Sequence, residues 1–257
     1  MSCKQDFGPD IAANQPIVTY GPPGDTSKYT AENCNITSAS ATVESITCTT
    51  VAGVGVTLYF RVTIGGQIST NDVVASYSQP VISNVTMSAA TADTAGGTVL
   101  TVKGSHFGQT GDVPQLTIST TGSRDYTVNC TVVSDSVNMT CVVPEGIGKN
   151  FSLVVSVGGQ SSLPYATLFR YSSPEITGLL SDPIATNASL SQEVTIIGRY
   201  FGPGAEANSD YSASYGPSGV FLQSPSCTII NDTMVTCLPT QGAGKGRILL
   251  YRVSKIP

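Results

Sequence analysis

The stretch Thr140-Cys-Val-Val-Pro-Glu-Gly-Ile-Gly148 contains the pattern Cys-x4-Gly-x-Gly, which occurs three times in the chain. The other two copies begin at Cys48 and Cys237, and a threonine precedes the cysteine in every copy. Recurrence of one short pattern along a chain is typical of a tandem repeat, in which each copy carries the same structural turn. The pattern therefore predicts repeated domains.

The third copy includes Gly242-Ala-Gly-Lys-Gly246, which resembles a phosphate-binding loop. A P-loop needs a glycine five residues before its Gly-Lys pair and a Ser or Thr after the lysine. Pro239 and Gly246 occupy those two positions here. We therefore interpret the run as a turn of the repeat, with no nucleotide site.

Six of the seven cysteines form three local pairs, because each motif cysteine has a partner 10 to 14 residues upstream. This regular spacing predicts one hairpin-closing disulfide per repeat: Cys34–Cys48, Cys130–Cys141 and Cys227–Cys237. Cys3 is left over and is interpreted as an interchain thiol, an effect of the fragment's end or the partner of a missing cysteine. With a single histidine and no Cys-x2-Cys spacing, we expect no zinc or other metal ligands.

Other landmarks repeat in step with the cysteines, with a period of about 95 residues. They are Gly-Gly-Gln at 65–67 and 158–160, and the junction segments Tyr-Ser-Gln-Pro at 77–80 and Tyr-Ser-Ser-Pro at 171–174. They define three expected units, residues 1–79, 80–173 and 174–257. We expect the first unit to lack its first strands and the third to lack its last strands, as in a fragment of a longer array. Alternatively, the incomplete units complete one another between molecules by strand addition.

Alternating apolar residues mark the strands of each unit. In the middle unit Phe151, Leu153, Val155 and Val157 recur at every second position, which is the period of a half-buried strand. Short segments of this kind separated by Gly, Pro, Asp and Asn predict an all-β protein with a sandwich of about seven strands per unit.

The units resemble the IPT/TIG domain, the immunoglobulin-like fold shared by plexins, hepatocyte-growth-factor-type receptors and some transcription factors. The matching positions of the middle unit are Pro80-Val-Ile82, Gly96-Gly97-Thr98, His106-Phe107-Gly108, Cys130, Thr140-Cys141, Pro144 and Gly146-Ile-Gly148. The third unit lacks the Gly-Gly-Thr segment, and the first lacks a proline after Cys48. The resemblance implies tandem immunoglobulin-like β-sandwich domains in a linear array, and it implies no shared catalytic or ligand motif.

Composition limits the partners and the chemistry. Charged residues make up 11% of the chain and the net charge is −5, so we expect no nucleic-acid partner. No apolar run reaches the ~20 residues of a membrane span, and the first ten residues show no hydrophobic signal region. His106, the only histidine, is interpreted as a turn residue. We expect no catalytic residues and no cofactor; no EF-hand pattern occurs, and calcium held by irregular oxygens between repeats stays open.

Seven of the eleven asparagines stand in Asn-x-Ser/Thr sequons: Asn35, Asn84, Asn129, Asn138, Asn150, Asn187 and Asn231. Strand alternation sends Asn35, Asn129, Asn138 and Asn150 outward if the cysteines and Phe151 point inward. We predict N-linked glycans at the sequons. The alternative is that these are ordinary polar strand positions in a threonine-rich protein.

Paired cysteines and sequons favour an extracellular or cell-surface location, with a signal peptide outside this fragment. We expect a structural or adhesive glycoprotein that forms part of a fibre, stalk or appendage, with other copies or neighbouring repeats as its partners. The ectodomain of a plexin- or growth-factor-receptor-like protein is the competing hypothesis. A carbohydrate-binding module attached to an enzyme is a third, with little support from 18 Tyr and Phe residues and no Trp.

Overall fold

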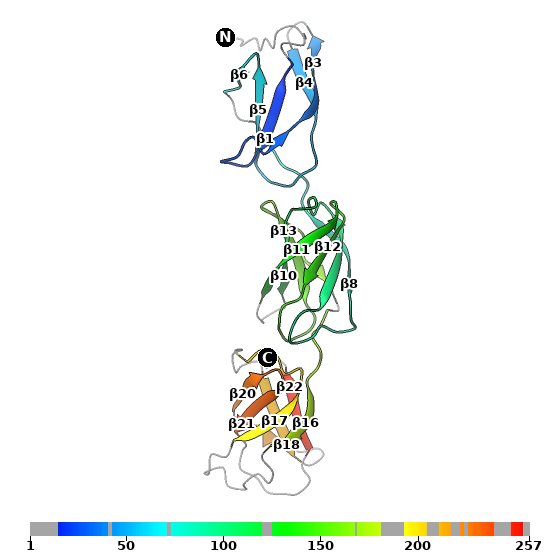
Figure 1. Cartoon of the computed structure of the whole chain (residues 1–257), viewed down its shortest axis with the longest axis vertical. Coiled ribbons are helices and arrows are strands. Elements are labelled where there is room, and N and C mark those ends of the chain that lie inside the picture. Colours follow the sequence, from blue (N-terminus) through cyan, green and yellow to red (C-terminus); the bar gives the residue numbers. More distant parts are fainter. Residues whose placement is uncertain are drawn as a thin grey trace.

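The structure is a computed structural model that describes residues 15–40, 43–70, 73–119, 125–167, 169–180, 193–204, 211–216, 222–223, 226–238 and 248–253. Within these ranges every regular element is a β-strand. The predicted all-β fold is therefore confirmed. The strands form three units that follow one another along the long axis of the molecule (Figure 1).

The middle unit is an immunoglobulin-like sandwich. One layer has the order β8 (Val81–Met87), β9 (Val99–Ser105), β12 (Asn138–Val142) and β11 (Tyr126–Ser134). The other continues from β11 through β10 (Gln115–Ser119) and β13 (Ser152–Val157) to β14 (Gln160–Ser161), with β15 (Tyr165–Ala166) also on β13. Every pair is antiparallel, and β11 passes from one layer to the other.

The two outer units repeat parts of this plan. In the first, β1 (Ile17–Gly21), β2 (Tyr29–Thr30), β5 (Leu58–Ile64), β6 (Gln67–Ile68) and β7 (Val73–Ala75) form one sheet, and β3 (Glu32–Ser40) pairs with β4 (Val43–Thr49). In the third, β16 (Glu175–Leu179), β17 (Val194–Arg199), β21 (Met234–Leu238) and β20 (Ser226–Asn231) form one sheet. The second sheet of that unit contains β19 (Leu222–Gln223), β18 (Tyr211–Gly216) and β22 (Ile248–Val253).

Alternating side chains build the core of the middle unit. Phe151, Leu153 and Val155 are fully buried, whereas the residues between them on β13 are half-buried on the outer face. The core also takes Leu100 and Val102 from β9, Met139 from β12 and Phe107 from the loop after β9. The alternation read from the sequence thus gives the correct inward face for this strand.

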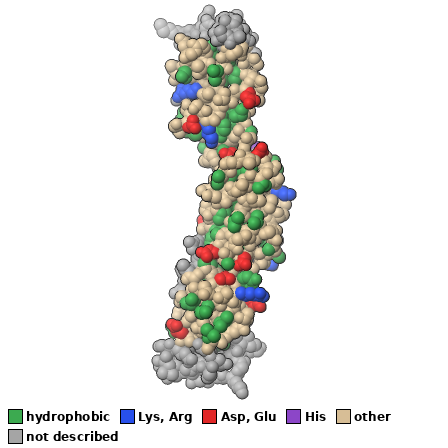
Figure 2. Space-filling model, viewed as in Figure 1, with side chains coloured by type: hydrophobic (Ala, Val, Ile, Leu, Met, Phe, Trp, Pro, Cys, Tyr) green, Lys and Arg blue, Asp and Glu red, His purple; other side chains and the backbone are tan. Residues whose placement is uncertain are grey.

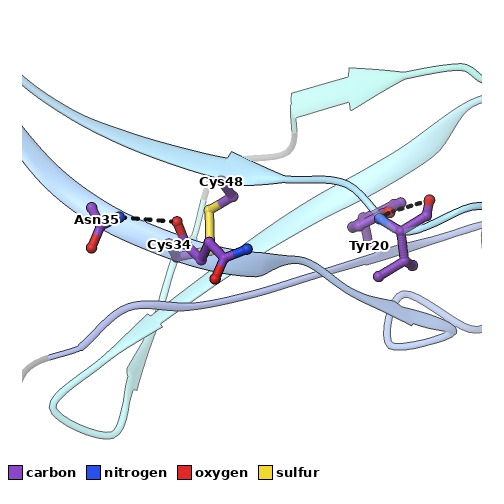
Figure 3. The surroundings of a disulfide bond; sticks show 6 residues. Tyr20, Cys34, Asn35 and Cys48 are labelled. Atoms are coloured by element: carbon purple, nitrogen blue, oxygen red, sulfur yellow. Dashed lines mark hydrogen bonds between the residues drawn. A yellow bond between two sulfur atoms is a disulfide. The ribbon is translucent and has the colours of Figure 1, made fainter.

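The structure forms all three disulfides predicted from the cysteine spacing. Cys130 lies directly opposite Cys141 on β11 and β12, and Cys227 lies opposite Cys237 on β20 and β21. These four cysteines are buried, so each bridge is part of the core of its unit. In the first unit the bridge Cys34–Cys48 joins β3 to β4, and the Asn35 side chain points away from it (Figure 3).

Tyrosine hydroxyls hold the Gly-x-Gly loop in the middle unit. The hydroxyl of Tyr171 donates to the carbonyl of Pro144 at 3.0 Å, and the backbone N–H of Ile147 donates to the hydroxyl of Tyr126 at 3.3 Å. A Cβ on Gly146 would lie 2.6 Å from the Tyr171 hydroxyl. The first glycine of the motif is therefore required because a tyrosine occupies the space of a side chain.

The first unit holds its loop in the same way. Tyr77 donates to the carbonyl of Val51 at 2.5 Å, and the hydroxyl of Tyr29 donates to the carbonyl of Val54 at 2.9 Å. A Cβ on Gly53 would lie 2.7 Å from the Tyr29 ring. Tyr20 completes the arrangement, since its hydroxyl lies 2.8 Å from that of Tyr77 and its ring stacks on Phe60.

Tyr171 makes the fold sensitive to alkaline pH. Burial, and next the neighbouring Tyr126, raise the pKa of Tyr171 above its ordinary value of 10.0. Its contribution to stability is therefore intact below about pH 10 and is lost as the pH rises further, because only the unfolded chain readily releases that proton. Thermal unfolding followed by circular dichroism should show a constant melting temperature from neutral pH to about pH 10 and a fall above it.

The variant Tyr171→Phe should lose about 1 kcal/mol of stability at neutral pH and show a smaller alkaline fall. Tyr165→Phe is the matched control, because it removes a hydroxyl from the same unit without touching the loop. An alkaline fall of the same size in Tyr171→Phe and wild type would contradict the assignment.

Candidate functional site

The joint between the first and middle units brings a glycine loop against a glycine turn. The backbone N–H of Val56 donates to the carbonyl of Gly158 at 3.2 Å. A Cβ on Gly158 would lie 2.6 Å from the nitrogen of Gly55, and one on Gly159 would lie 3.2 Å from the Val56 side chain. Backbone therefore meets backbone at this joint, and a side chain at position 158 would separate the units.

Two polar side chains of the middle unit fix the junction segment that leads into it. The side-chain amide of Gln160 donates to the carbonyl of Tyr77 at 2.8 Å. His106 lies 3.1 Å from the carbonyl of Gln79 through Nδ1, and its φ of 61° places it in a left-handed turn. His106 is thus a turn residue, as the sequence predicted, that also contacts the junction.

At the joint between the middle and third units, a side chain of the middle unit inserts into the core of the third. Ile147, the central residue of the Gly-x-Gly loop, is buried among core residues of the third unit, including Ile196 and Phe201. A Cβ on Gly202 would meet the Ile147 side chain, so this glycine makes room for it. The loop that tyrosines hold within one unit therefore presents its central side chain to the next.

A partly buried hydrogen bond accompanies the insertion. The hydroxyl of Thr94, which is 1% exposed, donates to Oδ1 of Asp232 at 2.5 Å. The same oxygen accepts the backbone N–H of Gly202 at 2.9 Å. One carboxylate thereby links the two units and orders the turn that receives Ile147.

Sequence reasoning did not find these joint residues. It treated Gly-Gly-Gln at 65–67 and 158–160 as landmarks of the repeat, and the tyrosines before the prolines as junction markers. The repetition of these residues was the available signal. The function of these residues depends on their contacts with the neighbouring unit, which the sequence alone does not show.

Most predicted sequon asparagines with described surroundings lie at the surface. Asn35, Asn84, Asn129, Asn150 and Asn231 are exposed. Asn138 is half-buried, and its Oδ1 is buried without a hydrogen bond from the described part of the chain. Asn187, Cys3 and the loop Gly242–Gly244 lie outside the described residues.

Strand register groups the sequons of the middle unit. Asn84 and Asn138 both lie opposite Lys103, on either side of it in the same row of the sheet. At the usual spacing between strands their Cα atoms are about 10 Å apart. The hydroxyl residues of three sequons stand in the neighbouring row, which runs Thr131, Thr140, Thr101, Thr86.

The described surface carries few charged side chains. Figure 2 shows scattered acidic and basic side chains on a mainly uncharged surface. Glu175 and Arg199 form an exposed ion pair, and the described residues contain no group of three or more His, Cys, Asp or Glu that could hold a metal ion. None of the described segments forms a helix that could cross a membrane.

Residues 80–171 match the family model of the IPT/TIG domain. No curated protein matches the sequence. Similar solved structures include SGBP-B from a complex xyloglucan utilization locus in Bacteroides uniformis. It aligns with 19% identity over 68% of this chain and 46% of its own length, with a TM-score of 0.27.

The full extracellular region of Plexin A4 aligns with 15% identity over 92% of this chain and 19% of its own length, with a TM-score of 0.27. The FN1–FN3 domains of chicken CNTN1 align with 9% identity over 93% of this chain and 91% of theirs, also with a TM-score of 0.27. This chain thus spans less than half of the xyloglucan-locus protein and about a fifth of the plexin region.

The two Gly-Gly turns provide a matched test of the first joint. Gly158 and Gly65 share a left-handed φ, 57° and 56°, which asparagine also adopts, and Asn-Gly is a favoured hairpin turn. Gly158→Asn should open the joint, because its side chain collides with the backbone of Gly55, at a cost of about 1–3 kcal/mol. Gly65→Asn should leave the joint and the melting temperature unchanged.

Small-angle X-ray scattering of the whole chain measures the outcome. Gly158→Asn should change the distribution of interatomic distances, as expected when two units move independently. Equal scattering curves for the two variants would show that the contact between Gly55 and Gly158 does not hold the units together.

Proposed function

We propose that this chain, which carries an IPT/TIG domain at residues 80–171, is part of a non-enzymatic extracellular glycoprotein that builds a cell-surface fibre, stalk or appendage. The single observation that carries the proposal is the insertion of Ile147 into the core of the third unit. A unit that completes its neighbour's core acts as a spacer of fixed direction, which is the property that a stalk or fibre needs.

The joints support a semi-rigid rod. The last strand of the first unit, β7, ends at Ala75 and the first strand of the middle unit, β8, begins at Val81, so the connection is short. Gln160 and Val56 form hydrogen bonds at the joint between the first and middle units. Thr94 and Asp232 form one at the joint between the middle and third units. Neighbouring units with such contacts keep their relative orientation better than units on a flexible linker.

The disulfides support an extracellular location. Each closes a hairpin of 10 to 14 residues in a small domain, where a bridge contributes about 3 kcal/mol. Such bonds persist in oxidising compartments and are rare in the cytosol. A stalk outside the cell benefits because its units must stay folded without chaperones.

The sequons support a glycosylated surface. Five of them are exposed, and Asn84 and Asn138, which flank Lys103, lie in the same row of a sheet. N-linked glycans there would cover the exposed edge and outer face of the sandwich, which limits association between sheet edges.

The ectodomain of a plexin- or growth-factor-receptor-like protein is a second candidate. The resemblance of the repeat to domains of such receptors favours it, since the same modules would space a ligand-binding head from the membrane. Flanking sequence separates the two functions: further IPT/TIG units favour the fibre, and a head domain with a membrane-spanning helix favours the receptor.

Glycosylation provides the decisive measurement. The chain secreted from eukaryotic cells should lose mass on enzymatic deglycosylation, and Asn84→Gln and Asn129→Gln should each remove one glycan. Asn33→Gln is the matched control, because Asn33 lies on strand β3 and is not part of a sequon. An unchanged mass after deglycosylation would argue against the proposal.

Electron microscopy of the same material tests the rod. Particles should be elongated, with three units in line. The double variant Cys130→Ser, Cys141→Ser should have a lower melting temperature, because it lacks the disulfide of the middle unit. Compact particles with the units folded against one another would contradict a spacer function.

A further inference from the structure

The hairpin turn between β20 and β21 in the third unit carries the sequon Asn231-Asp-Thr233. The backbone N–H and the hydroxyl of Thr233 both donate to Oδ1 of Asn231, each at 2.9 Å. A backbone N–H can only donate, so it meets the oxygen of the side-chain amide and leaves Nδ2 on the opposite side. Asn231 is exposed, so this nitrogen, which is the atom that receives an N-linked glycan, is directed away from the turn.

Asn231 stands at one end of a row of residues that crosses the outer face of the sheet. It lies opposite Met234 on β21, and the next strand of the row, β17, contributes Ile197. The neighbours of these two residues along their strands, Val235 and Ile196, are fully buried in the core of the unit. Met234 and Ile197 therefore project from the outer face, where both are half-buried. At the usual spacing between strands, the Cα atoms of Asn231 and Ile197 are about 10 Å apart.

The far end of this row is a glycine. Gly178 on β16 lies opposite Ile197, has no positive φ, and a Cβ on it would meet no atom within 4 Å. The strand is bulged here, but the middle unit has the same bulge with Asn84 at the same place, so the bulge does not require glycine. Glycine inside a strand costs stability and often marks a site that a ligand approaches closely. A molecule lying along the row explains it.

The equivalent row of the middle unit is polar. It consists of Ser134, Asn138, Lys103 and Asn84. Ser134 holds the place of Asn231, so the hairpin turn of the middle unit has no sequon at this position. Of these two units, the one with a sequon at the turn is also the one with two apolar side chains in the row.

Polar side chains border the apolar pair on both sides. Two residues further along β17 is Arg199, which forms an exposed ion pair with Glu175 on the same face. On the other side, Thr195 and Thr236 lie opposite each other. A sugar ring has apolar C–H faces and a rim of hydroxyl groups. An apolar strip between a charged pair and two hydroxyls matches both parts of such a ring.

We propose that an N-linked glycan on Asn231 lies back along this row, with its first two N-acetylglucosamine residues packed on Met234 and Ile197. The inference rests on the proposed function and names a sugar-binding surface for one of its glycans. On attachment, Nδ2 loses a hydrogen and bonds to C1 of the first sugar, which a lipid-diphosphate-linked oligosaccharide donates. The lipid diphosphate is the leaving group, and the proton is released.

The contact is intramolecular and follows from the chemistry of the row. The C–H faces and acetamide methyl groups of the sugars cover Met234 and Ile197, which removes apolar area from water. The sugar hydroxyls reach the pair of Arg199 and Glu175 at the border. A covered row gives neighbouring rods no apolar strip on which to associate.

Oxidation of Met234 by hydrogen peroxide measures the cover, because peroxide converts an accessible methionine to its sulfoxide. The whole chain secreted from eukaryotic cells is compared with Asn231→Asp, whose carboxylate keeps the acceptor for Thr233 and takes no glycan. Peptide mass spectrometry should show several-fold faster oxidation of Met234 in Asn231→Asp. Met87, half-buried in the middle unit, should react at the same rate in both chains. Asn84→Asp is the matched control, because it removes a glycan from the equivalent sheet and should leave Met234 at the wild-type rate.

Three results would overturn the inference. Equal oxidation of Met234 with and without a glycan on Asn231, or an empty Asn231 beside filled sequons elsewhere, would do so and leave the glycoprotein function in place. Slow oxidation in Asn231→Asp that becomes fast on dilution would show that a second copy of the chain covers the row instead. A chain that carries no glycan at all, as the intact mass would show, contradicts the proposed function as well as this inference.

Discussion

A tyrosine occupies the space next to the first glycine of each described Gly-x-Gly loop, and the order of the whole molecule depends on this contact. The ring and hydroxyl leave no room for a side chain, and the hydroxyl donates a hydrogen bond to the loop backbone, from Tyr171 to Pro144 and from Tyr29 to Val54. In the first and middle units, tyrosines thus fix the loop against its own core. Because the loop is fixed, its outer surface has one shape, and a neighbouring unit can pack on it.

The two joints use the loop differently. At the joint with the middle unit, backbone atoms of the first unit's loop pack against the backbone of Gly158. At the joint with the third unit, the Ile147 side chain of the middle unit's loop packs in the apolar core of the third unit. The first joint depends on shape and on hydrogen bonds, whereas the second also removes apolar area from water. The second joint should therefore be the more stable of the two.

The same contacts explain why the joints contain glycines and few charged side chains. Glycines at the joints admit a neighbouring backbone or side chain, and a charged side chain buried there without a partner would be costly. Asp232 is accommodated because Thr94 and the N–H of Gly202 both donate to it. Charge elsewhere lies on outer faces, as with the exposed pair of Glu175 and Arg199.

The sequence by itself determined the repeat, the three disulfides and the inward faces of the strands, because these follow from local spacing: a bridge joins opposite residues of one hairpin, and alternation has a period of two. It did not identify Tyr171 as the residue that holds the Gly-x-Gly loop, or Ile147 and Asp232 as joint residues. Each acts on atoms far away in the chain or in another unit, where no local pattern records the contact. Only the tertiary structure decided which glycine faces a ring, which faces a neighbour and which faces water.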